Sequence, residues 1–105
     1  MGRISIAAFK PKPGKEADLL AITEDHLPIL RSQGLATDRP HIVCKAADGT
    51  IIEAFEWVSD EAIEKAHSNP EVHKLWQRYF DACDSVTLDQ LPEAKGPFPT
   101  FDAVN

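Results

Sequence analysis

The pair Asp48-Gly49 constrains the fold of this chain most, because it separates two runs that are rich in β-branched and aromatic residues. Asp-Gly between such runs is among the strongest short-range hairpin signals, since a type I′ turn needs a positive φ at both of its central residues. We therefore expect an antiparallel hairpin, with one strand at residues 41–47 and the next at residues 50–57.

The segment before the hairpin predicts one strand and one long helix. Residues 3–10 read as a strand, and a breaker run of two prolines, a lysine and a glycine ends it at residues 11–14. A helix then fits residues 15–33, with Gly34 as its stop signal.

The segment after the hairpin predicts two helical pieces and a fourth strand. Ser59 or Asp60 caps the first piece. Pro70 starts the second piece, because a proline suits the first position of a helix, where its missing N–H costs nothing. This second piece runs to about Cys83, and a short strand follows at residues 85–88.

The predicted order is β-α-β-β-α-β followed by a tail. This order is typical of an α+β domain of ferredoxin-like type, in which helices pack on one face of an antiparallel sheet. We expect the domain at residues 1–91. An extension at residues 92–105 should pack on the domain or on a dimer partner.

The first strand carries apolar side chains on both faces, which favours a sheet that is buried on both sides. Ile4, Ile6 and Ala8 share one face, whereas Ala7 and Phe9 share the other. A chain this short leaves much of its surface exposed. We therefore expect a homodimer in which a second copy covers the face that the helices leave open.

Charge and motifs exclude several classes of function. The chain has 17 acidic and 11 basic residues and a net charge of -6, which argues against nucleic acid or an anionic membrane as a partner. Its first residues lead directly into a short apolar alternation without a signal or spanning segment, so we expect a cytoplasmic protein. Cys44 and Cys83 lack CxxC spacing and should be reduced core thiols.

Bound metals and phosphate cofactors are also not expected. The four histidines form no HxxxH or HxH pair. The chain has no glycine-rich phosphate loop and no GxSxG motif. We therefore expect no metal ion and no cofactor.

His26 is the first candidate for chemistry, because the helix at 15–33 places it near the middle of an apolar arc with Thr23 beside it. The arc consists of Leu19, Leu20, Ile22, Leu27, Ile29 and Leu30. Acidic residues fall on the opposite side of the helix. An inward-pointing histidine is therefore a specific prediction.

Glu53 is the second candidate, because it is the polar member of an apolar strand face that it shares with Ile51, Phe55 and Trp57. If that face meets the helices, Glu53 and His26 line one cavity. A carboxylate and an imidazole there are either a general-base pair or a buried structural pair.

The length of the hairpin loop predicts the partners of this strand. A two-residue loop pairs Cys44 with Glu53 and His41 with Glu56. His41 and Glu56 would then form an ion pair at the surface or at an interface.

The later helix carries a mostly apolar stripe that includes Trp76 and Tyr79. Both side chains have polar atoms that need partners when buried, so one or both should border a cavity. His67 lies just before the break at Asn69-Pro70 and should face the same space.

Three segments resemble the antibiotic-biosynthesis-monooxygenase (ABM) family: the run Ala8-Phe9-Lys10-Pro11-Lys12-Pro13-Gly14-Lys15-Glu16, the strand Glu53-Ala54-Phe55-Glu56-Trp57, and Ala66-His67 with Asn69-Pro70-Glu71-Val72. The resemblance covers about residues 3–88 and implies a dimeric α+β barrel. Such families include cofactor-independent monooxygenases of aromatic polyketides, haem-degrading enzymes and isomerases. The haem degraders resemble this chain least, because their strand-one asparagine is Ala7 here and their helix histidine falls near Trp76.

The resemblance implies an ABM-like, cofactor-independent monooxygenase that acts on a small aromatic or quinone-like molecule. Proton transfer would fall to His26, Glu53 or His67. Substrate contacts would come from Thr23, Trp57, Trp76 and Tyr79. Two alternatives remain: a non-catalytic small-molecule-binding or stress-related dimer, and an interaction module that uses the aromatic tail.

Overall fold

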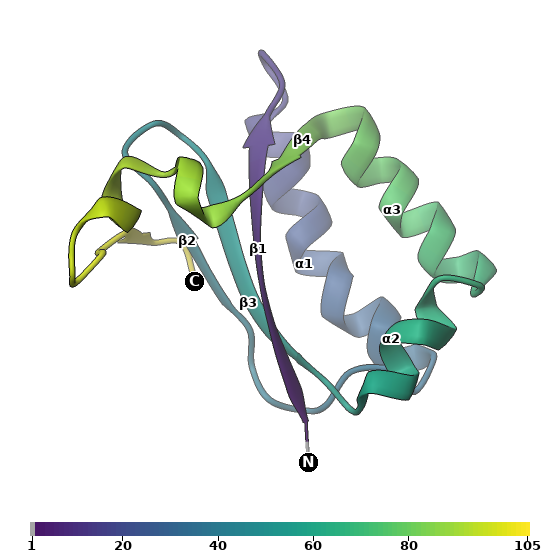
Figure 1. The fold of residues 1–105 in the computed structure, drawn as a ribbon. Coiled ribbons are helices and arrows are strands. Elements are labelled where there is room, and N and C mark those ends of the chain that lie inside the picture. The colour runs from purple at the N-terminus through teal and green to yellow at the C-terminus, as the bar shows by residue number, and fades with distance from the viewer. Residues whose placement is uncertain (1) are drawn as a thin grey trace.

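The structure is a computed structural model that describes residues 2–105 as an α+β fold with a five-stranded antiparallel sheet and three α-helices (Figure 1). The strands are β1 (Arg3–Pro11), β2 (Ile42–Lys45), β3 (Ile51–Trp57), β4 (Cys83–Val86) and β5 (Asp102–Ala103). The helices are α1 (Glu16–Ser32), α2 (Asp60–Ala66) and α3 (Pro70–Ala82), and two short 3-10 turns lie at Leu88–Gln90 and Pro92–Lys95.

The strand order in the sheet is β4-β1-β3-β2-β5, so β1 and β3 are central neighbours. Figure 1 shows the helices on one side of the sheet and the C-terminal tail on the other. This arrangement is compatible with the predicted ferredoxin-like fold. The radius of gyration is 13.7 Å, close to the roughly 13 Å of a single packed domain of about 100 residues.

The helix boundaries agree with the local signals in the sequence. The Ser59 side chain accepts a hydrogen bond from the amide of Ala62 at the start of α2, and Asn69 caps α3 directly before Pro70. Gly34 follows α1 with a φ of 72°, a conformation that favours glycine. Among the described residues, no helix is long and apolar enough to cross a membrane.

The fourth strand begins earlier than predicted. It follows α3 without a loop and occupies Cys83–Val86 rather than residues 85–88. The ladder with β1 explains the difference, because Cys83 and Asp84 pair with Pro11 and Lys10. A backbone hydrogen bond of 2.9 Å from Lys12 to Ala82 extends this pairing to the end of α3.

The predicted hairpin forms, but the prediction of a two-residue loop is wrong. The amide of Ala46 donates to the carbonyl of Thr50 at 2.8 Å, and Gly49 has a φ of 92°. Three residues, 47–49, therefore form the loop, and only the glycine takes the left-handed conformation.

The longer loop shifts the register by one residue. Val43 lies opposite Glu53, and Cys44 lies opposite Ile52. The predicted pairs of Cys44 with Glu53 and of His41 with Glu56 are therefore wrong. Because side chains alternate along a strand, this slip turns Cys44 away from the helices.

The two faces of the sheet are covered to different extents. The helix side, which is the face of Glu53, is closed by buried apolar side chains of α1 and α3. On the other side, Leu91 and Phe101 pack near Ala8 and Ile52, and Phe101 belongs to the C-terminal extension. The isoleucines Ile4, Ile6 and Ile42 remain 57%, 53% and 64% exposed.

Candidate active site

The Glu53 carboxylate is the centre of the site and is completely buried. His26 Nδ1 lies 2.9 Å from Oε1, and His41 Nδ1 lies 2.7 Å from Oε2. The Tyr79 hydroxyl donates a third hydrogen bond to Oε1 at 3.1 Å. Three separate segments of the chain thus bring donors to one strand residue.

These partners keep Glu53 ionised. Burial acts to raise the pKa of this carboxyl, but the hydrogen bonds from His26 and His41, and the charge that each ring carries when it is protonated, outweigh burial and hold the pKa below its ordinary value. An ionised carboxylate has no proton to donate, so both imidazoles present Nδ1–H to it.

The hydrogen bond to Glu53 determines the form of the His26 ring. With its proton on Nδ1, a neutral imidazole carries a free lone pair on Nε2. Nε2 makes no hydrogen bond within residues 2–105. Within these residues, Glu93 Oε1 is the only buried side-chain nitrogen or oxygen that lacks a hydrogen-bond partner. Because Nε2 of His26 lacks a partner but is not among the buried atoms, solvent reaches it.

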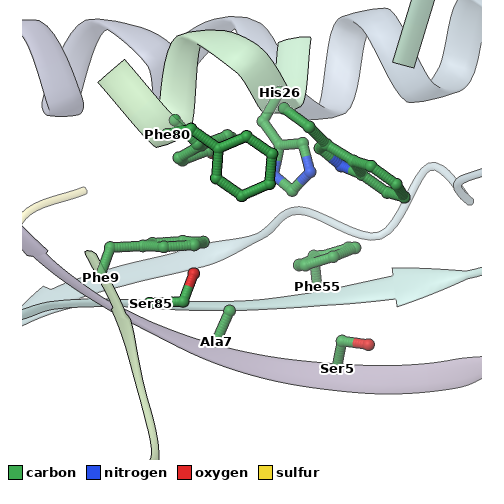
Figure 2. Close-up of a pocket in the computed structure, with 9 residues that line it drawn as sticks. Ser5, Ala7, Phe9, His26, Phe55, Phe80 and Ser85 are labelled. Carbon is green, nitrogen blue, oxygen red and sulfur yellow. The ribbon is translucent and has the colours of Figure 1, made fainter. Parts of the chain in front are cut away.

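A pocket of about 270 Å³ between the helices and the sheet provides this access. His26 lines the pocket, and Figure 2 shows its ring pointing into the gap above the sheet. Aromatic side chains form most of the wall, namely Phe9, Phe55, Trp76, Tyr79 and Phe80. Ser5 and Ser85 add hydroxyls on the sheet side, and Ala7 lies between the labelled side chains of β1 (Figure 2).

Aromatic contacts fix the orientation of the His26 ring. Its centroid lies 4.7 Å from that of Phe55 and 5.4 Å from that of Tyr79, both in edge-to-face geometry. Tyr79 in turn stacks on Phe9 at 4.6 Å. The imidazole is therefore held between two rings, with one nitrogen on the carboxylate and the other toward the pocket.

The structure brings together four of the seven residues that sequence reasoning selected. His26, Trp76 and Tyr79 line the pocket. Glu53 does not line it but is hydrogen-bonded to His26. Trp57 is buried next to the pocket, where its Nε1 donates to the hydroxyl of Ser5 at 2.9 Å.

Thr23 and His67 do not line the pocket. The Thr23 hydroxyl is buried and donates to the carbonyl of Leu20 at 2.7 Å, so it is bound within its own helix. His67 ends α2 at the surface, where its Nδ1 lies 2.8 Å from the carbonyl of Ile63. The ring of His67 packs edge-on against Trp76 at 5.2 Å.

His41 was not among the residues selected from the sequence, because the predicted strand face of this residue depended on a two-residue hairpin loop. The wrong register placed this residue opposite Glu56, whereas Glu56 accepts hydrogen bonds from Thr37 and Arg39. A three-residue loop, which also ends in glycine, would have placed His41 on the face of Glu53. The aromatic side chain of Phe9 carried no comparable signal in the sequence.

The two cysteines show no feature of a nucleophile. Both are free thiols, and burial raises the pKa of each, to about 11 for Cys83. The Cys83 thiol donates to the carbonyl of Tyr79 at 3.1 Å. The described residues also contain no group of three or more His, Cys, Asp or Glu that is arranged to hold a metal ion.

No family model matches this chain, and comparison with curated proteins and with solved structures also finds no match.

Proposed function

We propose that the protein is a cofactor-independent monooxygenase that acts on a small aromatic, quinone-forming molecule, as its resemblance to the ABM family implies. One observation carries this proposal: His26 binds a buried carboxylate through Nδ1 and opens its other nitrogen into an aromatic pocket. In this arrangement the imidazole can act as a general base, because the carboxylate on Nδ1 stabilises the protonated ring.

The size and lining of the pocket suit a ligand of one or two fused rings. Its volume of about 270 Å³ lies just below the roughly 300–1,000 Å³ that small-molecule sites span. Phe55 and Trp76 offer ring faces or edges, while Ser5 and Ser85 offer hydroxyls to an oxygen of the ligand. A phenol of this size, 1-naphthol, is therefore a suitable probe.

His26 has two tasks in the proposed reaction. Nε2 first takes the phenol proton, and the naphtholate then transfers an electron to O₂. Recombination of the two radicals forms a C–O bond at the ring carbon opposite the phenol oxygen, and His26 returns its proton to the peroxide. Glu53 stabilises the imidazolium during this interval.

The reaction then ends with the loss of water. His26 removes the hydrogen from the new C–O carbon, the O–O bond breaks, and the released hydroxide takes that proton. In total, 1-naphthol and O₂ give 1,4-naphthoquinone and H₂O. One oxygen atom enters the ring, the other leaves as water, and no separate reductant is consumed.

Oxygen uptake with 1-naphthol tests the proposal. The wild-type protein should consume O₂ and form 1,4-naphthoquinone with one oxygen-18 atom when the gas is labelled. His26→Gln should lower the rate by about 10²–10⁴-fold, the usual contribution of a general base. His73→Gln is the matched control, because His73 is exposed and does not line the pocket. Equal rates for His26→Gln and the wild-type protein would overturn the assignment.

A second candidate is a non-catalytic binder of small aromatic molecules. It is favoured by the complete set of donors on Glu53, which a purely structural carboxylate also needs. This candidate predicts that 1-naphthol binds in calorimetry while no O₂ is consumed.

We also propose that the protein forms a homodimer through the outer face of the sheet. Support comes from Ile4, Ile6 and Ile42, which are each more than half exposed on the side away from the helices. Apolar side chains grouped on one face favour burial against a partner, and a twofold dimer matches the same face of two copies.

A further inference from the structure

His41 is a second histidine on the Glu53 carboxylate, and the backbone around it is firmly held. It directly precedes β2, and its Nδ1 lies 2.7 Å from Glu53 Oε2. The side-chain amide of Asn105 donates to the carbonyl of His41 at 2.9 Å and accepts from the amide of Val43 at 2.8 Å. These contacts fix where the imidazole lies.

The two histidines use separate oxygens of the same carboxylate and differ in exposure. His26 binds Oε1 and its side chain is 4% exposed, whereas His41 binds Oε2 and its side chain is 20% exposed. His41 can therefore exchange protons with bulk water, while His26 reaches solvent through the pocket.

We infer that His41 is a positioning residue of this site, which holds Glu53 Oε2 in place and, by its charge, sets how much of the carboxylate's negative charge is left for His26. The effect of His41 on turnover rests on the proposed function. Its effect on the hydrogen bond between Glu53 and His26, which we call the coupling of the two histidines, does not depend on that function.

Electrostatics determines the direction of this coupling. When His41 is protonated, the ion pair with Glu53 cancels much of the negative charge that favours a proton on His26. The groups that face the carboxylate are His26 from α1, Tyr79 from α3 and His41. Tyr79 stays neutral, because burial and the charge of Glu53 raise its pKa. Removing the charge of His41 should therefore strengthen the hydrogen bond between His26 and Glu53.

The substitution His41→Asn separates the charge of this residue from its hydrogen bond. The amide nitrogen of asparagine lies where histidine has Nδ1, so the variant keeps a donor to Oε2 but carries no titratable charge. Should this variant fold poorly, His41→Gln carries the same amide one carbon further along. His73→Asn is the matched control, since His73 contacts the carbonyl of His67 rather than Glu53.

The test is the NMR signal of the His26 Nδ1–H proton at one fixed, mildly acidic pH, because this signal moves downfield as the hydrogen bond to Glu53 Oε1 strengthens. In His41→Asn, we expect the signal to lie downfield of its position in the wild-type protein, since the uncharged amide leaves more of the carboxylate's negative charge for His26. In His73→Asn, the His26 signal should equal that of the wild-type protein. A His26 signal that is the same in His41→Asn and in the wild-type protein would overturn the inference.

Oxygen uptake with 1-naphthol separates this inference from the proposed function. If both hold, His41→Asn changes the rate of O₂ uptake as well as the His26 signal, whereas His73→Asn changes neither. If the signal moves but the wild-type protein consumes no O₂, the function fails and the coupling stands. If His26→Gln lowers uptake by about 10²–10⁴-fold while His41→Asn leaves the His26 signal in place, the coupling fails and the function stands.

Discussion

His26 and Glu53 are joined by a hydrogen bond of 2.9 Å although they lie 27 positions apart, one on a helix and one on the sheet. Both side chains are buried, so the contact ties the helix layer to the sheet inside the core. A buried carboxylate is tolerated only when its oxygens have partners, since an unpaired buried charge is strongly unfavourable. The same contact should therefore control stability as well as any chemistry.

Replacing Glu53 with glutamine should destabilise the fold. In Glu53→Gln, the side-chain amide nitrogen would replace one carboxylate oxygen and face an imidazole N–H, so two donors would meet and a hydrogen bond would be lost. This loss should lower the free energy of unfolding by about 2 kcal/mol. Urea unfolding at pH 7 measures this difference. Glu64→Gln, on the exposed side of α2, is the control and should change it by less than about 0.5 kcal/mol. Equal losses in both variants would show that the donors around Glu53 do not stabilise the protein.

The contribution of Glu53 should disappear in acid. Its pKa in the folded protein is lowered, so its stabilising effect is complete above the ordinary value of 4.5 and is lost as the pH falls toward the folded value. The gap in unfolding free energy between the wild-type protein and Glu53→Gln should therefore shrink below about pH 4.5. Urea titrations at a series of acidic pH values test this, and a gap that stays constant down to pH 3 contradicts it.

Tyr79 should resist ionisation until the protein unfolds. Its pKa is raised above the ordinary 10.0, mainly by burial and then by the charge of Glu53. The stability that this phenol contributes is complete below pH 10 and is lost as the pH rises. Because the chain has one tyrosine, the tyrosinate absorbance band reports on this residue alone.

The alkaline titration of that band has a clear expected outcome. Absorbance should rise together with the loss of helical circular dichroism, whereas in urea it should rise near pH 10. Tyrosinate that forms near pH 10 while the helices stay intact would mean that the hydroxyl does not donate to Glu53.

The parts of the fold that could be predicted depend on short-range signals. The start of α3 at Pro70, the end of α1 before Gly34 and the inward position of His26 each follow from a few neighbouring residues. His41 could not be placed, because its face depends on whether the hairpin loop has two or three residues, and both loops accept Asp48-Gly49.

The pocket was predictable only in part, for a related reason. A helical or strand period shows which side chains share a face, but the space between two faces depends on side chains that meet from distant elements. One or both of Trp76 and Tyr79 were expected to border a cavity, because each has a polar atom that needs a partner when it is buried. Phe9 and Ser85 come from strands whose pairing positions them in the pocket wall.

Filling the pocket should block binding without unfolding the protein. Ala7 lines the pocket on the sheet side, so Ala7→Leu would place three further carbons in the cavity. We expect calorimetry to show binding of 1-naphthol at least about tenfold weaker, a loss of about 1.4 kcal/mol. Ala21→Leu adds the same carbons on the exposed side of α1 and should leave the affinity unchanged. Unchanged affinity in Ala7→Leu would place the ligand elsewhere.

A charge on the outer face of the sheet should separate the proposed dimer. Ile6 is 53% exposed within one chain, so Ile6→Lys costs little in a monomer but places an ammonium group inside a sheet-to-sheet interface. Light scattering at micromolar concentration should give a dimer mass for the wild-type protein and a monomer mass for the variant.

The control for this experiment is Gln77→Lys, which makes the same change of charge on the exposed surface of α3. It should keep the dimer mass, because the helix layer lies on the opposite side of the sheet (Figure 1). A monomer mass for the wild-type protein would show that the isoleucines stay in solvent. Dissociation by Gln77→Lys but not by Ile6→Lys would place the interface on the helices.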